Sequence, residues 1–550
     1  MRMNFFAAAV LGLAMGASAV GQSGEAKHEE KVVVAGAPVA AAVVARVADS
    51  VTEGTVTVGG QAVAYRAVAG TLTVGASATQ DAMIGLDGKY LPDAGMDLAA
   101  KVEDQPATAR MFYTAYFRKD AGGKKRPVTF LYNGGPGSST MWLHMGTFGP
   151  KRVVTTDTQH DMAAPYLLVE NKYSLLDVTD LVFIDAPGTG YSRIFGKDKE
   201  KAFWGTDADA RAFERFIRRF LTKYDRWNSP KYLFGESYGT TRSAVLSHAL
   251  QNVDLNGVIL VSSILSFDDS ADGPGANPGT DQAYALALPT YAATAFYKHL
   301  VPGQTGTLES FLKEVEAFAL GEYMSALLQG ADLPAARRQA VAEKLAGYTG
   351  LPVKYWMRAD LRVSGGEFSK ELQAERGLTT GRLDTRYDGP DIDPLSQNAG
   401  YDPQSAAVSS AFQTGINEYM HGELKYGQEM TYKPNAYGEQ RAAGGWDLRH
   451  AQPGGPQGFD GSVNVMTDLA MTMKLNPKMR VMLTGGYFDA ATIFFGATYE
   501  MKHLPIPASL QGNISYHFYP AGHMFYVNEE ILGAFRKDVV EFIRATESGR

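Results

Sequence analysis

The stretch Phe234–Gly239 places the strongest constraint on how this chain folds. It reads Phe-Gly-Glu-Ser-Tyr-Gly and joins an apolar run, Lys231–Phe234, to a helix-like run, Thr240–Leu250. A strand that turns through Gly-x-Ser-x-Gly into a helix holds the central serine in a strained conformation with its hydroxyl exposed. The glycines are needed because a Cβ at either place would collide with the packed strand and helix. This context predicts that Ser237 is a nucleophile.

Short apolar runs alternate with helix-like stretches on both sides of this turn. Such runs are typical of strands buried on both faces, and strands that alternate with helices favour a mainly parallel sheet covered by helices. One helix is expected over Thr206–Leu221, where Thr206 and Asp209 resemble a capping box. The predicted strands are Val128–Tyr132, Leu181–Ile184, Lys231–Phe234, Val258–Val261, Arg480–Leu483 and Ser515–Tyr519. The pattern therefore predicts an α/β fold with helices on both faces of the sheet.

The first residues of the chain look like an export signal. Arg2 gives a basic start, a short apolar run follows, and Ala17–Ala19 offers small residues for cleavage. The apolar run is shorter than the roughly 20 residues that a membrane anchor requires. The chain has no cysteine, which excludes disulfides and thiolate catalysis. We therefore expect an exported protein, periplasmic or secreted, with no membrane span once the signal is removed.

Changes in composition suggest how the rest of the chain is organised. The pattern of alternating strands and helices breaks in the middle of the chain, which we interpret as an inserted, largely helical cap, or else as extra helices with no lid role. The predicted segments are a signal peptide (1–19), a leader with a small N-terminal β hairpin (20–85), the first part of the core (86–265), the inserted cap region (266–445) and the second part of the core (446–550).

The charge balance and the glycine-rich motifs exclude several functions. The chain carries 52 basic and 59 acidic residues, a net charge of −7, and no basic stripe, so nucleic acid is not an expected partner. The glycine-rich segment Asn133–Ser139 lacks the Gly-Lys-Ser/Thr ending of a phosphate loop, which argues against nucleotide binding. We therefore expect no cofactor and no metal.

A serine nucleophile needs a histidine base, and that histidine needs a carboxylate to orient it. In this arrangement the chain order is serine, acid, histidine, and each residue follows a strand. His523 comes directly after the last apolar run, and Asp489 is the first carboxylate after Arg480–Leu483. Asp489 could instead cap the helix that follows it. The order and the placement at strand ends predict the triad Ser237, Asp489 and His523.

A serine that attacks a carbonyl group also needs two backbone N–H groups that face the oxyanion formed on the carbonyl oxygen. One is expected from Tyr238, the residue after the nucleophile, and the other from the loop Asn133–Ser139, which follows a predicted strand. His144 precedes the serine and is therefore out of order for the triad, so we expect it to line the site instead.

Five motifs together resemble serine carboxypeptidases, peptidase family S10, and they occur in the order seen in that family. The resemblance runs from about Ala109 to the C-terminus, and the inserted region matches weakly. The chain looks most like a bacterial, exported, cysteine-free branch of the family. The motifs are Asn133–Ser139, Asp185–Ser192, Gly235–Gly239, Gly486–Asp489 and Ala521–Met524.

This resemblance implies an α/β-hydrolase fold and the release of C-terminal residues from peptides, so the expected partners are peptides with a free C-terminus. It also implies roles for residues that the motifs alone leave open. Gly135 and Tyr238 would supply the oxyanion N–H groups. Asn133, Glu236 and the N–H of Gly134 would bind the C-terminal carboxylate of the substrate.

The role implied for Glu236 has a chemical consequence. A carboxyl binds a carboxylate well only if the two share a proton, so the pKa of Glu236 should be raised and acidic pH should favour binding. Where the family often has a second supporting carboxyl, this chain has Thr147, which weakens the expectation of a strongly acidic optimum. The alternatives are an esterase or acyltransferase that uses the same triad, and a peptide-binding protein without catalysis.

Overall fold

The computed structural model describes residues 47–547, apart from 93, 96–97, 121–124 and 456–461. The predicted signal peptide (1–19) and nearly all of the predicted leader lie outside the described residues. Within the described ranges, no helix is both long enough and apolar enough to cross a membrane.

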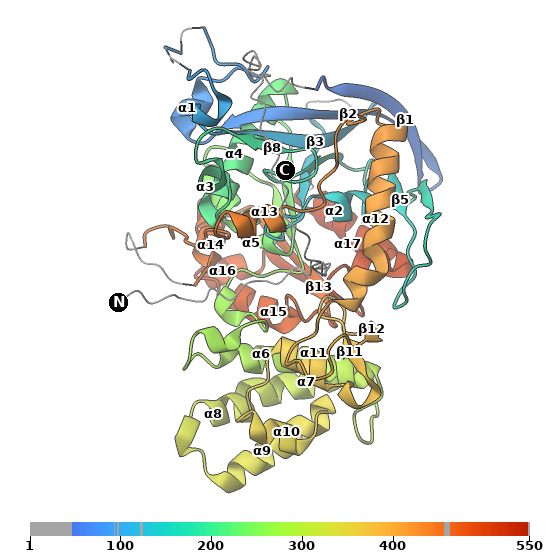
Figure 1. Cartoon of the computed structure of the whole chain (residues 1–550), viewed down its shortest axis with the longest axis vertical. Coiled ribbons are helices and arrows are strands. Elements are labelled where there is room, and N and C mark those ends of the chain that lie inside the picture. Colours follow the sequence, from blue (N-terminus) through green and yellow to red (C-terminus); the bar gives the residue numbers. More distant parts are fainter. Residues whose placement is uncertain (1–46, 93, 96–97, 121–124, 456–461, 548–550) are drawn as a thin grey trace, which may run out of the picture.

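A 10-stranded sheet forms the centre of the molecule (Figure 1). One part of it is parallel, from β7 through β4, β9, β10 and β13 to β14, and the other part, β1, β2 and β3, is antiparallel. β8 (Arg193–Phe195) pairs with β3 beside this path. The strands in spatial order are β1 (Ser50–Val58), β2 (Gln61–Gly75), β3 (Thr108–Arg118), β7 (Asp180–Ile184), β4 (Val128–Tyr132), β9 (Lys231–Glu236), β10 (Gly257–Val261), β13 (Arg480–Gly486) and β14 (Ile514–Tyr519).

The parallel part confirms the predicted fold class. Every apolar run predicted as a strand lies in it, and the ends differ by at most a few residues. β4, β7 and β10 are buried on both faces, which explains why they are continuously apolar rather than alternating.

The N-terminal hairpin differs in extent from the small unit expected. Gly59 and Gly60 both have positive φ, +56° and +78°, as a two-residue turn between twisted strands requires. β2 is 15 residues long, and its residues from Tyr65 to Gly75 pair with β3. The hairpin thus extends the antiparallel side of the main sheet.

Helices cover both faces of the sheet. On one face α4, α5 and α14 share an apolar core with β4 and β10, and on the other α2, α12 and α17 pack against β9. These helices are α2 (Met141–Gly146), α4 (Thr206–Lys223), α5 (Tyr238–Ala249), α12 (Pro403–Gly422), α14 (Met466–Leu475) and α17 (Glu529–Glu547).

The region predicted as an inserted cap, 266–445, has two structural parts. Its first helices lie together in the lower part of Figure 1 and share a separate apolar core, which also includes Phe488 and Ile493 of the sheet domain. α12, by contrast, packs on the sheet. The helices of the first part are α6 (Gln282–Tyr297), α7 (Leu308–Phe318), the π-helical turn η5 (Ala319–Tyr323), α8 (Met324–Leu327), α9 (Ala335–Thr349), α10 (Val353–Arg358) and α11 (Gly365–Glu371).

Short elements complete the described chain. Two small antiparallel pairs are β5 (Lys151–Val153) with β6 (Leu168–Glu170) and β11 (Leu378–Thr380) with β12 (Asp388–Pro390). The short α-helices are α1 (Ala78–Ala82), α3 (Lys199–Phe203), α13 (Tyr437–Ala442), α15 (Phe494–Lys502) and α16 (Ala508–Gln511). The 3-10 turns are η1 (Val102–Asp104), η3 (Phe267–Asp269), η4 (Pro274–Ala276), η6 (Gly330–Asp332), η7 (Ala374–Arg376) and η8 (Phe525–Val527).

Candidate active site

Ser237 lies in the sharp turn between β9 and α5. Its φ of +61° and ψ of −131° are strained for a residue with a side chain, and the residue is half-buried. A Cβ on Gly235 would lie 2.2 Å from the carbonyl oxygen of Gly239, and one on Gly239 would lie 2.9 Å from that of Tyr132. Both glycines are therefore required by close packing, for the reason that the sequence suggested.

The structure brings Asp489 and His523 together at the ends of β13 and β14. Nδ1 of His523 lies 2.7 Å from Oδ2 of Asp489. The other carboxylate oxygen accepts the N–H groups of Ala491 and Thr492, at 2.8 and 2.9 Å, and the Thr492 hydroxyl donates to Oδ2 at 2.7 Å. Burial lowers the pKa of His523, but the Asp489 carboxylate outweighs it and raises the pKa above its ordinary value. Thr492 carries no sequence signal that would have identified it.

The end of β10 connects the serine turn to the histidine loop. The N–H of Ser237 donates to the carbonyl oxygen of Val261 at 2.9 Å. The next residue, Ser262, donates its hydroxyl to the carbonyl oxygen of His523 at 2.8 Å. Two consecutive residues thus hold the predicted nucleophile and the predicted base at the same edge of the sheet.

The glycine-rich loop after β4 lies against the start of α5. A Cβ on Gly134 would be 2.4 Å from the backbone nitrogen of Tyr238, so only glycine allows this approach. Gly135 and Gly137 have φ of +109° and +90°, which favour glycine as well. Tyr238 is the first residue of α5, where a backbone N–H has no partner within the helix. This arrangement suits an oxyanion hole.

Glu236, Asn133 and Tyr526 form a buried polar cluster beside the serine turn. The Tyr526 hydroxyl donates to Oε2 of Glu236 at 2.8 Å, and the nearby Asn133 side chain lowers the pKa of this carboxyl. The N–H of Leu143 donates to Oδ1 of Asn133 at 3.1 Å, so the amide NH₂ is the group left to face the cluster. Burial raises the pKa of Glu236 to about 7, although the charge of His523 opposes this. Sequence reasoning missed Tyr526.

A segment of the inserted region, Gly381–Arg386, contacts both loops that carry the acid and the base. The carbonyl oxygen of Arg382 accepts the N–H of Ala490 at 3.0 Å, one residue after the acid. The carbonyl oxygen of Leu383 accepts the N–H of His523 at 2.6 Å. The insertion therefore supports the site through backbone hydrogen bonds.

Asp384 in this segment adds a charged contact to the histidine loop. Its Oδ2 accepts the N–H of Gly522 at 3.0 Å, next to the predicted base. Nη2 of Arg386 lies 2.7 Å from the same oxygen and 2.9 Å from Oδ1 of Asp157. The side chains of Asp384 and Arg386 are 0% and 6% exposed, so this is a buried ion pair.

A second buried ion pair supports the glycine-rich loop from behind. Nε of Arg242, on α5, lies 2.6 Å from Oδ2 of Asp209, on α4, and Nη1 donates to the carbonyl oxygen of Asn133 at 2.7 Å. Both side chains of the pair are fully buried. The predicted capping box is wrong, because Gly205 is the N-cap of α4 and makes no side-chain cap bond. Asp209 is recruited by Arg242 instead, a long-range contact that local spacing cannot reveal.

Two other histidines have structural environments. His144 is buried in the core, with Nε2 2.7 Å from the Tyr116 hydroxyl and its ring stacked on Phe183. Burial lowers its pKa to about 3. The expectation that His144 lines the site is therefore corrected: it packs beneath the sheet.

His450 joins the segment before α14 to α4. Its Nδ1 lies 2.6 Å from Oδ1 of Asp207 and its Nε2 lies 2.8 Å from Oδ2 of Asp468. Burial lowers the pKa of His450, but the two carboxylates outweigh it and raise the pKa to about 9. His450 is thus an imidazolium in a structural ion cluster near neutral pH.

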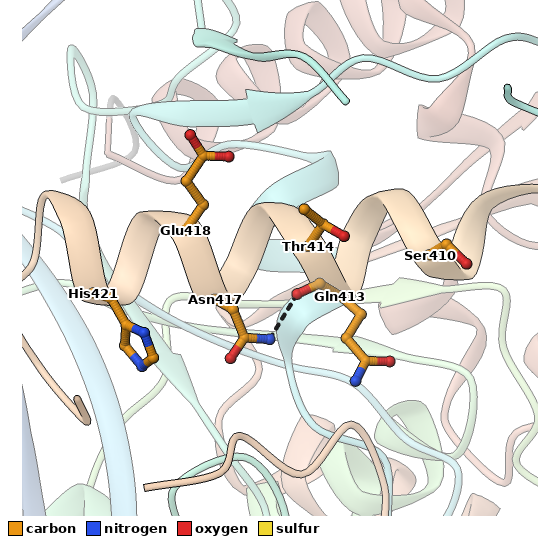
Figure 2. A pocket seen from close by; sticks show the side chains of 6 residues that line it. All are labelled: Ser410, Gln413, Thr414, Asn417, Glu418 and His421. Atoms are coloured by element: carbon orange, nitrogen blue, oxygen red, sulfur yellow. Dashed lines mark hydrogen bonds between the residues drawn. The ribbon is translucent and has the colours of Figure 1, made fainter. Parts of the chain in front are cut away.

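A surface pocket elsewhere on the molecule is separate from these residues. It runs along α12, where Nδ2 of Asn417 donates to the carbonyl oxygen of Gln413 at 2.7 Å (Figure 2). No residue of the predicted triad lines it. The lining residues are Ser410, Gln413, Thr414, Asn417, Glu418 and His421.

Comparison with known proteins identifies relatives of part of this chain. Residues 101–271 match the family model for serine carboxypeptidases. The matched range contains the glycine-rich loop and the serine turn, and it ends before Asp489 and His523. The predicted family is thus supported by the part of the chain that holds Ser237.

Fungal carboxypeptidases are among the curated relatives that match this chain. A carboxypeptidase Y homolog of Arthroderma benhamiae is 31% identical over 147 residues, 26% of this chain and 27% of the relative. The pheromone-processing carboxypeptidase KEX1 of Yarrowia lipolytica is 31% identical over 142 residues, 25% of this chain and 21% of the relative. The matches thus span about a quarter of these relatives' length. Because these relatives are fungal, they do not support the predicted bacterial branch.

Among solved structures, the chain is similar to the crystal structure of KEX1(delta)p, a prohormone-processing carboxypeptidase from Saccharomyces cerevisiae. The TM-score is 0.48 and the identity 14%, and the alignment covers 87% of this chain and 91% of that one.

Proposed function

We propose that this protein is a serine-type carboxypeptidase that releases C-terminal residues from peptides through an acyl-enzyme on Ser237. The observation that carries the proposal is the buried cluster of Asn133 and Glu236 beside the serine turn. An amide donor and a carboxyl whose pKa is raised to about 7 suit the binding of a carboxylate better than that of a neutral ester.

The mechanism begins with attack by the Ser237 hydroxyl on the carbonyl carbon of the last peptide bond. Nε2 of His523 takes the hydroxyl proton, while its Nδ1–H stays hydrogen-bonded to Asp489, which fixes the tautomer and stabilises the imidazolium. The N–H groups of Gly135 and Tyr238 would stabilise the oxyanion. His523 then gives its proton to the leaving amine, and the C–N bond breaks.

Water completes the reaction. The same imidazole takes a proton from a water molecule, which attacks the ester carbonyl of the acyl-enzyme, and the serine leaves with its proton restored. No cofactor enters these steps.

Recognition of the C-terminal carboxylate is assigned to Glu236, Asn133 and the N–H of Gly134. The protonated form of Glu236 donates a hydrogen bond to the substrate, whereas the ionised form repels it. With a pKa of about 7, Glu236 is protonated below neutral pH and loses its proton as the pH rises through 7. The KM for peptides with a free C-terminus should therefore rise above pH 7. In Glu236→Gln, this rise should disappear, since an amide does not titrate.

A direct test compares a blocked tripeptide with its C-terminal amide. The expected result is that the free acid is cut at its last bond and the amide is spared. Ser237→Ala should abolish cleavage, leave the unfolding curve unchanged and prevent labelling by a fluorophosphonate probe. Equal cleavage of acid and amide would contradict the exopeptidase assignment.

The alternative is an esterase or acyltransferase that uses the same triad. It is favoured by Thr147, which replaces the second supporting carboxyl expected from the family resemblance and donates its hydroxyl to the carbonyl oxygen of Leu143 at 2.5 Å. Competition between a blocked dipeptide acid and a simple aryl ester separates the two. Preference for the ester at all pH values would favour the alternative.

Export is proposed on the pattern in residues 1–19. Amino-terminal sequencing of the protein recovered from outside the cytoplasm tests it, with Val20 as the expected first residue.

A further inference from the structure

Tyr526 contacts the carboxyl proposed to recognise the substrate. It lies in η8, three residues after His523, and its hydroxyl donates to Oε2 of Glu236 at 2.8 Å. Both side chains are buried, each in a residue that is 2% exposed. The Asn133 side chain lies near the Tyr526 hydroxyl and lowers its pKa.

The fold provides a fitted position for the Tyr526 ring. A Cβ on Gly146 would lie 2.7 Å from Cε2 of this ring, so the ring packs directly on the backbone of α2. The hydroxyl of the next residue, Thr147, donates to the carbonyl oxygen of Leu143. The aromatic ring is thus held against Gly146, and its hydroxyl reaches the carboxyl of Glu236.

We propose that Tyr526 is a positioning residue for Glu236 and thereby a determinant of specificity for a free C-terminal carboxylate. This inference rests on the proposed function. A neutral carboxyl carries its proton on one oxygen and accepts on the other. Because Oε2 accepts from Tyr526, the acid proton belongs on Oε1, where it can be shared with the substrate. A fixed neutral donor thereby replaces a second titrating carboxyl.

The charges around Glu236 determine the direction of the pH effect. Burial raises its pKa, as does Asp489, whereas the charge of His523, the hydrogen bond from Tyr526 and the nearby Asn133 side chain lower it. Loss of the Tyr526 hydroxyl removes a bond that favours the ionised form, so the pKa of Glu236 must rise. The protonated, binding-competent form then persists to higher pH, but its proton is no longer directed to one oxygen.

The test is Tyr526→Phe, with Tyr519→Phe as the matched control. The Tyr519 hydroxyl also donates to a carboxylate, Oδ2 of the partly exposed Asp538, at 2.6 Å. For a blocked tripeptide acid, Tyr526→Phe should raise KM about tenfold at pH 5 and move the alkaline rise in KM upward by about one pH unit. Its kcat/KM for an aryl ester, which lacks a C-terminal carboxylate, should stay within about twofold of wild type, as should both values in the control.

A second readout does not depend on peptidase activity. Infrared difference spectra at a series of pH values report the carboxyl C=O stretch, and Glu236→Gln identifies the band of Glu236. The band should titrate at higher pH in Tyr526→Phe than in wild type. Titration at the same pH in both overturns the inference, even if the wild type proves to be an esterase. Equal cleavage of the tripeptide acid and its amide by the wild type would refute the proposed function, but it would not refute the positioning of Glu236 by Tyr526.

Discussion

Replacement of Asp384 by asparagine tests whether the inserted region holds the catalytic histidine in place. The wild-type carboxylate accepts the N–H of Gly522 at 3.0 Å and pairs with Arg386 through three hydrogen bonds to its side chain. Asparagine keeps the size but removes the charge. Both oxygens of Asp384 accept from the Arg386 guanidinium, so the NH₂ group of asparagine faces the guanidinium in either orientation, and in one of them it also faces the N–H of Gly522. The guanidinium therefore loses an acceptor in both orientations.

The contacts set the size of the effect. Breaking a buried ion pair by removing one partner costs about 3–5 kcal/mol. Arg386 keeps a second partner, Asp157, whose side chain is 27% exposed, so we expect the lower end, about 3 kcal/mol of unfolding free energy. A shift of about 1 Å in a catalytic group costs up to about 100-fold in rate, so kcat should fall about 10- to 100-fold while KM changes little.

Urea unfolding and steady-state kinetics on a blocked tripeptide measure both quantities. Asp388→Asn is the control, because Asp388 lies in the same region and pairs with Lys298 at 2.7 Å without touching the histidine loop. The control should lose stability and keep kcat. If Asp384→Asn is destabilised but its kcat stays within about twofold of wild type, the segment stabilises the fold only. The claim that it holds His523 in its catalytic position is then refuted.

Three further predictions concern other charged groups. The folded pKa of His450, about 9, lies above the ordinary value of 6.5, so its stabilisation of about 3 kcal/mol is fully present below pH 6.5 and is lost as the pH rises through 9. Urea midpoints of His450→Gln and wild type should thus differ at pH 6 and converge near pH 10, and a constant gap would contradict this. Arg242→Met should cost about 3–5 kcal/mol by leaving Asp209 buried and unpaired, and adding Asp209→Leu should restore part of it in the same unfolding assay. Asp489→Asn should lower kcat about 10⁴-fold with the fold intact, since His523 loses the partner that fixes its tautomer, and a loss below tenfold would argue against the triad.

Local patterns in the sequence were sufficient to predict the core. The strands β4, β9 and β13 are short apolar runs in the sequence. The turn around Ser237 is marked by Gly235 and Gly239, whose neighbours leave no room for a Cβ. These features depend on residues close together in the chain, so their spacing is visible without a structure. The candidate acid and base were found in the same way, from their places after strands.

Local patterns also misled. Thr206 and Asp209 have capping-box spacing, but Asp209 pairs with Arg242, 33 positions away. A buried carboxylate is stabilised more by a charged guanidinium than by the N–H groups of a helix end. His144 precedes the serine, which predicts a place lining the site, yet α2 holds it in the core, where burial lowers its pKa to about 3 and keeps it neutral.

By itself, then, the sequence determined the class of fold and the residue types of the candidate chemistry, since chain order and periodicity encode both. Only the tertiary structure decided what surrounds them. Tyr526 meets Glu236 across 290 positions and Asp384 meets Gly522 across 138, and neither pair has a spacing that marks it. The protonation and orientation of a buried carboxyl depend on such neighbours, because in a low-dielectric interior each missing or added hydrogen bond shifts the balance between its charged and neutral forms.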